Sequence, residues 1–339
     1  MILSRVAESC FWLGRYVERA ESTARLLRVN RSFVLDVPVE SIARWRPVVV
    51  VAGEDPRFRK LMGEEALSDG EVVEEYMAWH PDNPASLASS IFWARENART
   101  TREIVSLEMW QTLNTFYQWL KGGQGRRLWT TDREQFYLRM QELACLFWGV
   151  MYGTMLHEEP FDFVRLGMYF ERAGQTARMV DVRHHMLGPL GGQAIGTPIA
   201  TAHAMALLRS CSATEPFLKR TRGIPSGAAV VDFLMHDKAF PRSVRHCLDR
   251  ATHGLGRVRP GRANIGERTE QELEKLGQTL GEPGQATGAQ EDDAVHAMLT
   301  RFIDGLTSTC SVLESDFFAQ DWEGMITRES TKHRAASPA

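Results

Sequence analysis

A thirteen-residue pattern occurs twice in this chain, 153 residues apart. The first copy runs from Leu13 to Arg25 and the second from Leu166 to Arg178, and most of their positions are identical. In both copies apolar residues recur every three or four positions, which is the spacing of one face of an α-helix. The pattern predicts two long helices, one over about residues 3–34 and one that follows Pro160 and ends before residue 188.

Shorter matches continue in the same order along the chain. Val72-Val73 and Met77 recur as Val230-Val231 and Met235, and Pro84-x-Ser86 recurs as Pro241-x-Ser243. We interpret these matches as an internal duplication of about 155 residues. The predicted domains are a first helical half over 1–160, a second helical half over 161–326, and a flexible tail over 327–339.

The rest of the chain is also predicted to be helical. Further helices are expected over 86–122, 132–155 and 292–318, with a Gly- and Pro-containing loop over 277–290. Residues 47–52 are rich in β-branched side chains and could form a short strand, but nothing obvious would pair with it. The predicted fold class is therefore all-α, a helical bundle built from two pseudo-symmetric halves.

Charge and composition exclude several classes of function. The 339 residues carry 40 Lys+Arg and 43 Asp+Glu, so the formal charge of −3 gives no positive field for nucleic acid or anionic membranes. The longest uncharged run, residues 143–156, is too short to span a bilayer, and the N-terminus lacks the apolar segment of a signal peptide. Five scattered cysteines without a C-x-x-C suggest a reducing compartment, so we expect a cytoplasmic protein.

A line of charged residues lies beside each apolar seam of the two repeated helices. Its members are spaced by three or four residues, so they align on one helix face. Because each line lies about 100° around the helix from the seam, at the edge of the core, we expect these charges to be half-buried. The lines are Glu18, Glu21, Arg25 and Arg28 in the first helix, and Glu171, Arg178, Asp181 and His185 in the second.

A third charged segment, residues 95–99, repeats the Glu/Arg pattern, but its counterpart at 251–256 does not. A cluster on one side of a duplicated scaffold is what a single ligand site predicts. The alternative is that the charges form salt bridges that fix helix register, each contributing about 0.2–0.5 kcal/mol where exposed. Small residues such as Gly14 and Gly167 would let the helices approach closely and bury these charges.

Three stretches carry a family resemblance: FWLGRYVERAESTARLL, the AREN-AR element with SLEMWQTLN after it, and LGMYFERAGQTARMVDVRHH. On them the chain resembles the bacterial Alpha-E family, also labelled domain of unknown function 403, from the first helix to the last. The resemblance implies an all-helical cytoplasmic protein. It also implies an association with circularly permuted ATP-grasp ligases and transglutaminase-like peptidases, in peptide synthesis or modification.

The resemblance also implies which charged residues belong to the family's motifs. One position departs from the family, because Gly174 replaces a residue that is often acidic, and a site that needed this carboxylate would be impaired. We add His185 to the candidate ligand- or partner-binding residues because it extends the second charged line. The motif residues are Glu18, Arg19, Glu21 and Arg25; Arg95, Glu96, Asn97 and Arg99; and Glu171, Arg172, Arg178 and Asp181.

Other chemistries find little support in the sequence. A di-iron bundle needs Glu-x-x-His, which does not occur, and Asp181-x-x-His184 and His246-x-x-Asp249 are more typical of surface pairs than of metal ligands. There is no G-x-S-x-G nucleophile motif and no phosphate-binding glycine loop. The sequence therefore predicts no metal and no cofactor, and it identifies no catalytic residue.

Two hypotheses of function remain. In the first, the chain is a non-catalytic partner of an ATP-grasp ligase, and Arg25, Arg95 and Arg99 bind the carboxylate of a peptide, an amino acid or the partner. Glu18, Glu21 and Glu171 would hold those guanidinium groups or accept an amine. In the alternative, the chain is an enzyme that uses two close carboxylates as acid and base in an interhelical cleft, which requires one raised pKa.

Overall fold

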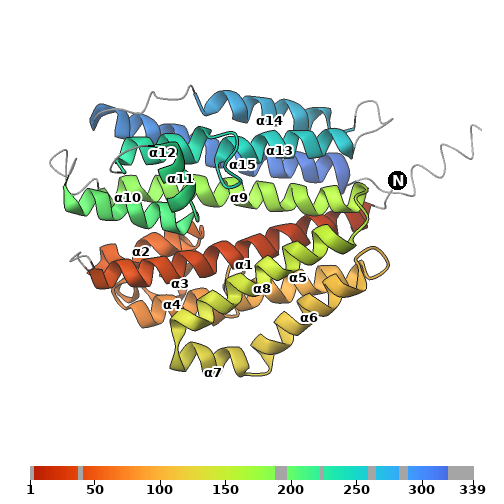
Figure 1. Cartoon of the computed structure of the whole chain (residues 1–339), viewed down its shortest axis with the longest axis horizontal. Helices are drawn as coiled ribbons and strands as arrows, with labels where there is room; N and C mark the ends of the chain where they lie inside the picture. Colours follow the sequence, from red (N-terminus) through yellow and green to blue (C-terminus); the bar gives the residue numbers. More distant parts are fainter. Residues whose placement is uncertain are drawn as a thin grey trace, which may run out of the picture.

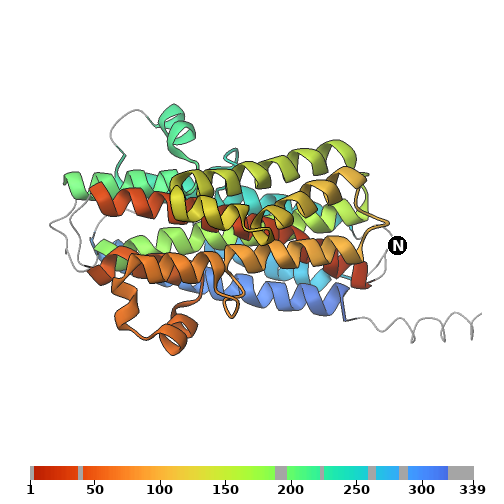
Figure 2. The same cartoon turned by 90° about the horizontal axis from the view of Figure 1, so that it is seen from below.

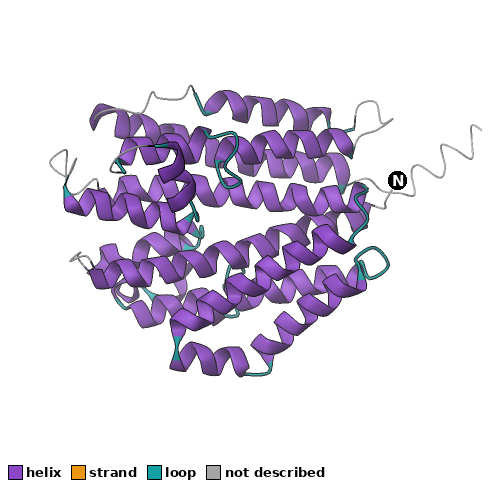
Figure 3. Ribbon diagram, viewed as in Figure 1, coloured by secondary structure: helices purple, strands orange, loops and turns teal. Residues whose placement is uncertain are grey.

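The computed structural model describes residues 4–36, 41–187, 197–221, 225–258, 265–281 and 289–319. Within these ranges every regular element is a helix and there is no strand (Figure 3). The predicted all-α fold class is confirmed. The elements are α1 Ser4–Asp36, α2 Ser41–Val51, α3 Asp55–Met62, the 3₁₀ turn η1 Glu65–Ser68, α4 Gly70–Trp79, α5 Leu87–Thr100, α6 Leu107–Lys121, α7 Gln124–Thr131, α8 Arg133–Thr154, α9 Glu159–Leu187, α10 Pro198–Ser210, α11 Thr214–Arg220, α12 Gly227–His236, α13 Val244–Arg257, α14 Glu267–Thr279 and α15 Ala289–Phe317.

Most of the expected helices lie close to their predicted bounds, and side-chain caps explain several of their starts. The Asp132 carboxylate accepts the backbone N–H of Gln135 at the start of α8. Ser86 and Ser243, the two serines of the repeated Pro-x-Ser motif, cap α5 and α13 in the same way. The predicted tail at 327–339 lies outside the described residues, and the division at residue 160 stays a prediction.

Two expectations about the elements were wrong, and one open alternative was decided. Residues 86–122 form two helices, α5 and α6, because the chain leaves the helix after Thr100 and Ser106 caps a new one. Residues 47–52 lie at the end of α2 and do not form a strand. The described residues contain no strand that could pair with this apolar segment, which packs as a helix. The predicted loop at 277–290 begins later, because α14 continues to Thr279.

The helices lie in two layers that share a long axis, as Figures 1 and 2 show from two directions. One layer holds α1 to α8 and the other α9 to α15. α1 and α9 run side by side where the layers meet, and α5 and α8 pack on α1 while α13 and α15 pack on α9. The central pair therefore receives side chains from both layers, and its polar residues can be buried.

Two glycines set the close approach of α1 and α9. A Cβ atom at Gly14 would overlap the carbonyl oxygen of Val164, and one at Gly167 would overlap the carbonyl oxygen of Phe11. The obstacle is backbone in both cases, so no larger residue fits without moving a helix. This contact fixes the register of two parallel helices, and it places the turn after each glycine beside the other helix.

Candidate functional site

Two Glu-Arg dipeptides on the central helices bind each other crosswise. Arg172 of α9 donates from Nε and Nη2 to Oε1 and Oε2 of Glu18, at 2.9 and 2.7 Å. Arg19 of α1 donates from Nε and Nη2 to Oε1 and Oε2 of Glu171, at 2.8 and 2.9 Å. Each pair is a bidentate fork, the strongest geometry that a guanidinium and a carboxylate form.

The first cluster comprises Glu18, Glu21, Arg25, Arg172 and Arg242. Arg242 comes from the turn before α13 and donates at 2.6 Å from Nη1 to Glu18 and at 2.6 Å from Nη2 to Glu21. Arg25 Nη2 donates to the same Oε1 atom of Glu21. The turn itself is anchored to α9, because the Arg242 carbonyl accepts the Thr176 hydroxyl at 2.8 Å.

The second cluster comprises Glu171, Arg15, Arg19 and Arg178. Arg15 donates from Nε to Glu171 Oε2 at 2.9 Å, so this carboxylate has two arginine partners, as Glu18 does. Arg178 has no carboxylate one turn before it, because Gly174 stands where the first cluster has Glu21. The Arg178 Nε donates instead to the backbone carbonyl of Val51 at 2.8 Å.

Burial and charge together decide the protonation of these carboxylates. Glu18 and Glu171 are 0% and 1% exposed. Burial by itself would raise the pKa of Glu18, but the Arg172 and Arg242 guanidinium groups outweigh it and hold this pKa at about 2. Burial likewise opposes Arg19 and Arg15 at Glu171, and the arginines again lower the pKa. Both carboxylates are therefore charged near neutral pH.

Guanidinium groups outnumber carboxylates in the two clusters. Six arginines, of which Arg25 is buried and the others are half-buried, face three glutamates, so the two clusters together carry a net positive charge. Burial lowers the pKa of Arg25, with Arg242 as the next cause, and burial also lowers the pKa of Arg178. A buried cation without a full counter-charge is costly, and an added anion would relieve that cost.

The structure does not bring the AREN-AR element into either cluster. Arg95, Glu96, Asn97 and Arg99 lie on α5, where Glu96 receives Arg95 at 2.7 Å and Arg99 at 2.8 Å. The Arg95 guanidinium packs over the rings of two α6 residues, and its Nε donates to Asn114 at 2.9 Å. The α6 rings are those of Trp110 and Tyr117. None of the polar contacts described for this element reaches Arg25, so the three arginines do not converge on one ligand position.

Three charged partners were not predicted from the sequence. Arg242 follows Pro241 of the repeated Pro-x-Ser motif, which was the available signal that this turn lies at a helix start. Arg15 lies one turn before Arg19 on the same helix face and could have been added to its line. His296 Nδ1 lies 2.5 Å from Oδ1 of Asp181, and no sequence pattern pointed to this pair. The side chain of His185 lies outside the described residues.

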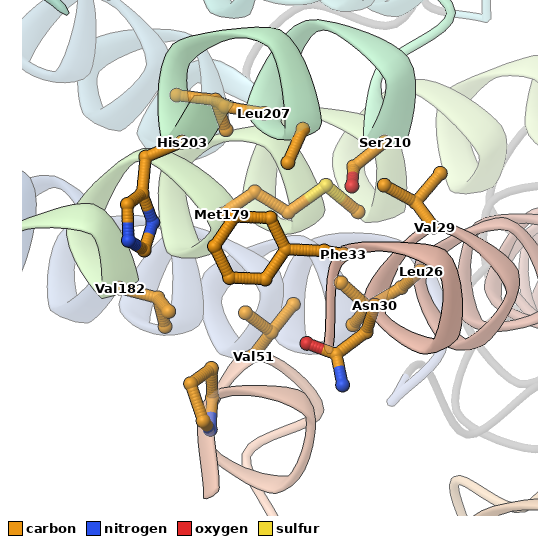
Figure 4. A pocket seen from close by; sticks show the side chains of 12 residues that line it. Leu26, Val29, Asn30, Phe33, Val51, Met179, Val182, His203, Leu207 and Ser210 are labelled. Carbon is orange, nitrogen blue, oxygen red and sulfur yellow. The ribbon is translucent and has the colours of Figure 1, made fainter. Parts of the chain in front are cut away.

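A small cavity of about 60 Å³ lies between α1, α2, α9 and α10, beyond the second cluster. Figure 4 shows Phe33, Met179, Val182 and Leu207 around it, with His203 at one side. The walls are mostly apolar, and an apolar cavity of this size offers little to a charged ligand. This cavity is therefore a weaker candidate for binding a charged ligand than the arginine clusters.

Two further features bear on the class of protein. Among the residues that the structure describes, no three His, Cys, Asp or Glu side chains gather where they could hold a metal ion. In the same ranges no helix combines the length and the apolar character that crossing a membrane requires.

Comparison with known proteins places the chain in a family. Uncharacterized proteins from Mycobacterium bovis and from two strains of Mycobacterium tuberculosis are each 27% identical to it over 337 residues. The match covers 90% of this chain but 36% of each relative, so the chain spans about a third of their length. No solved structure matches it significantly.

A family model extends over nearly all of the chain. It describes Alpha-E as a predicted alpha-helical domain with a conserved ER motif, and it matches residues 2–318. The two crossed dipeptides, Glu18-Arg19 and Glu171-Arg172, are Glu-Arg sequences of this kind and join the central helices. By this match, which spans both layers of the bundle, the chain belongs to the Alpha-E family.

Proposed function

We propose that this chain is a non-catalytic helical accessory unit of an ATP-grasp and transglutaminase-associated system that synthesises or modifies peptides. Its crossed Glu-Arg forks hold the central helices together. Its surplus arginines recognise the carboxylate of a ligand or of a partner protein.

The observation that carries this proposal is the excess of buried and half-buried guanidinium groups over carboxylates in the two clusters. Glu18 and Glu171 each neutralise one arginine, while each also receives a second one, Arg242 or Arg15. Guanidinium groups bind carboxylates with matched geometry, and they do so more strongly where water is excluded. A carboxylate is therefore the ligand that best completes the charge balance.

A partner protein is supported by the length of the relatives. Nearly two thirds of each mycobacterial relative lies outside the part that matches this chain. A chain that corresponds to one part of a longer protein is suited to act beside a separate partner chain. The family association with circularly permuted ATP-grasp ligases names the first partner to test.

The alternative of an acid-base enzyme is less well supported. A general acid needs a carboxyl group whose pKa is raised toward neutral pH. The pKa of Glu18 and that of Glu171 are both lowered, because each carboxylate is held by two arginines. These two residues are better suited to permanent charge than to proton transfer.

We also propose that the two halves arose by internal duplication. The support is that residues 153 positions apart play the same part in the central pair. Gly14 and Gly167 each meet the backbone of the other helix, and each Glu-Arg dipeptide binds the other. The repeated Pro-x-Ser motif also caps one helix in each half.

Co-expression tests the proposed function. The chain would be produced with the circularly permuted ATP-grasp ligase encoded nearest to its gene, and the pair purified through a tag on the ligase. We expect a stable complex and a change of at least several-fold in the rate of ATP consumption by the ligase. Absence of a complex together with an unchanged ligase rate would contradict the proposal.

Replacing Glu18 by Gln separates the accessory unit from the enzyme. If the chain is an accessory unit, we expect Glu18→Gln to lose stability or to lose assembly with the ligase. If the chain is an acid-base enzyme, we expect Glu18→Gln to lose its catalytic turnover while it still folds and assembles.

A further inference from the structure

One line of α1 carries buried polar atoms that form no hydrogen bond within the described residues. Oε2 of Glu21, Nη1 of Arg25 and Nε of Arg28 have no hydrogen-bond partner in the part of the chain that the structure describes. Glu21 is 2% exposed and Arg25 5%. Buried polar atoms are nearly always paired in folded proteins, because leaving them unpaired is costly. Three in successive turns of one helix face therefore indicate a place where a ligand supplies the partners.

The same three side chains are held in place through their other atoms. Oε1 of Glu21 accepts from Arg25 and, at 2.6 Å, from Arg242. Nη1 of Arg28 donates to Glu134 of α8 at 3.2 Å. The unpaired atoms, two N–H donors and one acceptor, thus belong to side chains whose positions are already fixed. We call Glu21, Arg25 and Arg28 the α1 stripe.

Charge restricts the ligand further. The first cluster holds three arginines and two glutamates, and Arg28 is balanced by Glu134. One positive charge is left over, so a monoanion completes the balance. The acceptor on Glu21 also requires that the ligand donate a hydrogen bond. A fully ionised phosphate has no proton to donate and would be repelled by the Glu21 carboxylate.

We propose that the α1 stripe binds an α-carboxylate together with the N–H group on the adjacent carbon, as the C-terminus of a peptide presents them. The carboxylate would accept from Arg25 and Arg28, and the N–H would donate to Glu21. A peptide C-terminus carries one negative charge, whereas a free amino acid with the same two groups is neutral overall. This inference rests on the proposed function and names the chemistry and the position of its carboxylate ligand.

Cys145 of α8 provides a built-in reporter. It is exposed, whereas Cys10, Cys211, Cys247 and Cys310 are buried. α8 packs on α1, which carries the stripe. Burial raises the pKa of the Cys145 thiol, the Glu21 charge raises it further and the Arg25 charge lowers it, so the thiol senses the charges of the stripe. A ligand on the stripe would therefore slow the reaction of this one cysteine with a thiol reagent.

The test measures that protection on the isolated full chain. The probes are N-acetyl dipeptides with each of the twenty amino acids at the C-terminal position, each compared with its C-terminal amide and with the free amino acid. We expect saturable protection of Cys145 by at least one acid, with its amide binding at least tenfold more weakly. Arg28→Gln should weaken that binding at least tenfold, whereas Arg139→Gln, an exposed change on α8, should leave it unchanged.

Each outcome decides the proposal. Protection by free amino acids without the acetylated peptides would overturn it, because a free amino acid is neutral overall and would not complete the charge balance. No protection by any acid, equal protection by acid and amide, or full binding in Arg28→Gln would overturn it. The ligase is absent from this experiment, so a negative result here would not contradict a complex between the chain and the ligase. Equally, a failure to form that complex would not contradict peptide binding by the isolated chain.

Discussion

The first and second clusters share a crossed fork but differ in their remaining charges. In the first, Arg25 and Arg242 both reach Glu21, a second carboxylate one turn after Glu18. In the second, Gly174 stands in place of such a carboxylate, and Glu171 is shared by Arg15, Arg19 and Arg178. In both clusters the fork joins α1 to α9. The two clusters differ in the charged groups around the fork.

This difference distinguishes an arginine with a structural contact, Arg178, from an arginine that is a candidate for ligand binding, Arg25. Arg178 uses a backbone carbonyl of α2 and has become part of the packing of that helix. Among the described residues, Nη1 of Arg25 and Oε2 of Glu21 have no hydrogen-bond partner. Arg178, which has no carboxylate one turn before it, therefore contributes to helix packing. Glu21 and Arg25 together present an acceptor and a donor that a ligand could use.

Removing one carboxylate at a time should give the largest effects. Glu171→Gln removes the carboxylate that three half-buried arginines share, so we expect a loss of about 3–5 kcal/mol in the free energy of unfolding. Glu18→Gln should cost less, about 2–3 kcal/mol, because Glu21 still neutralises Arg242. Urea unfolding followed by circular dichroism measures both.

Glu142→Gln is the matched control, since Glu142 forms an exposed pair with Arg139, and we expect a change within about 0.5 kcal/mol. If Glu18→Gln proved as costly as Glu171→Gln, the two clusters would not differ in the way their charges indicate.

The glycine contact that both clusters share should give the next largest effect. Gly14→Ala and Gly167→Ala each force a methyl group into the backbone of the opposite helix, and we expect losses of about 3 kcal/mol that are similar for the two. Gly149→Ala on α8 is the control. Nothing lies near a Cβ there, so helix propensity should make this variant about 0.5–1 kcal/mol more stable. Stable Gly14→Ala protein would contradict the close approach.

Acid should weaken both clusters in the same direction. The pKa of Glu18 is about 2 in the folded chain against 4.5 ordinarily, and that of Glu171 is also lowered. A group with a depressed folded pKa stabilises fully above its unfolded value and loses that contribution as the pH falls through its folded value. We therefore expect the free energy of unfolding to fall from about pH 4.5 toward pH 2. The fall should be shallower in Glu18→Gln, and an equal slope in that variant would argue against this origin.

Restoring the missing carboxylate should give the smallest effect. Gly174→Glu places an acid one turn before Arg178, where a Cβ would meet the ends of the flexible Leu306 and Arg178 side chains. We expect this variant to be about 1 kcal/mol more stable than Gly174→Gln, which has the same shape without the charge. Thermal melts at neutral pH would show the difference, and it should vanish in acid. Equal melting temperatures would mean that the Val51 carbonyl already satisfies Arg178.

Much of the scaffold could be read from the sequence, because its signals are local. The apolar spacing in Leu13–Arg25 and Leu166–Arg178 specifies helices whatever surrounds them. Asp132 and Ser86 specify helix starts through hydrogen bonds within one turn. The break between α5 and α6 was missed, because the helical pattern continues across residues that the chain does not keep in a helix.

The candidate site was readable only in part. The sequence placed Glu18, Glu21 and Arg25 on one helix face, since their spacing alone determines that alignment. The sequence did not predict that Arg242, from a distant turn, joins the first cluster. It also did not predict that Arg95 lies outside both clusters. Those assignments depend on how helices far apart in the chain pack against each other.

The sequence by itself determined the helices, the two close-packing glycines and the charged lines beside the seams, because these follow from spacing along one chain. The tertiary structure alone decided that each Glu-Arg dipeptide binds the opposite helix, and that donors and an acceptor on one line of α1 have no partner among the described residues. The physical reason is that the partners and the burial of a charge are set by the backbone that packs over it, and local sequence does not encode that neighbour.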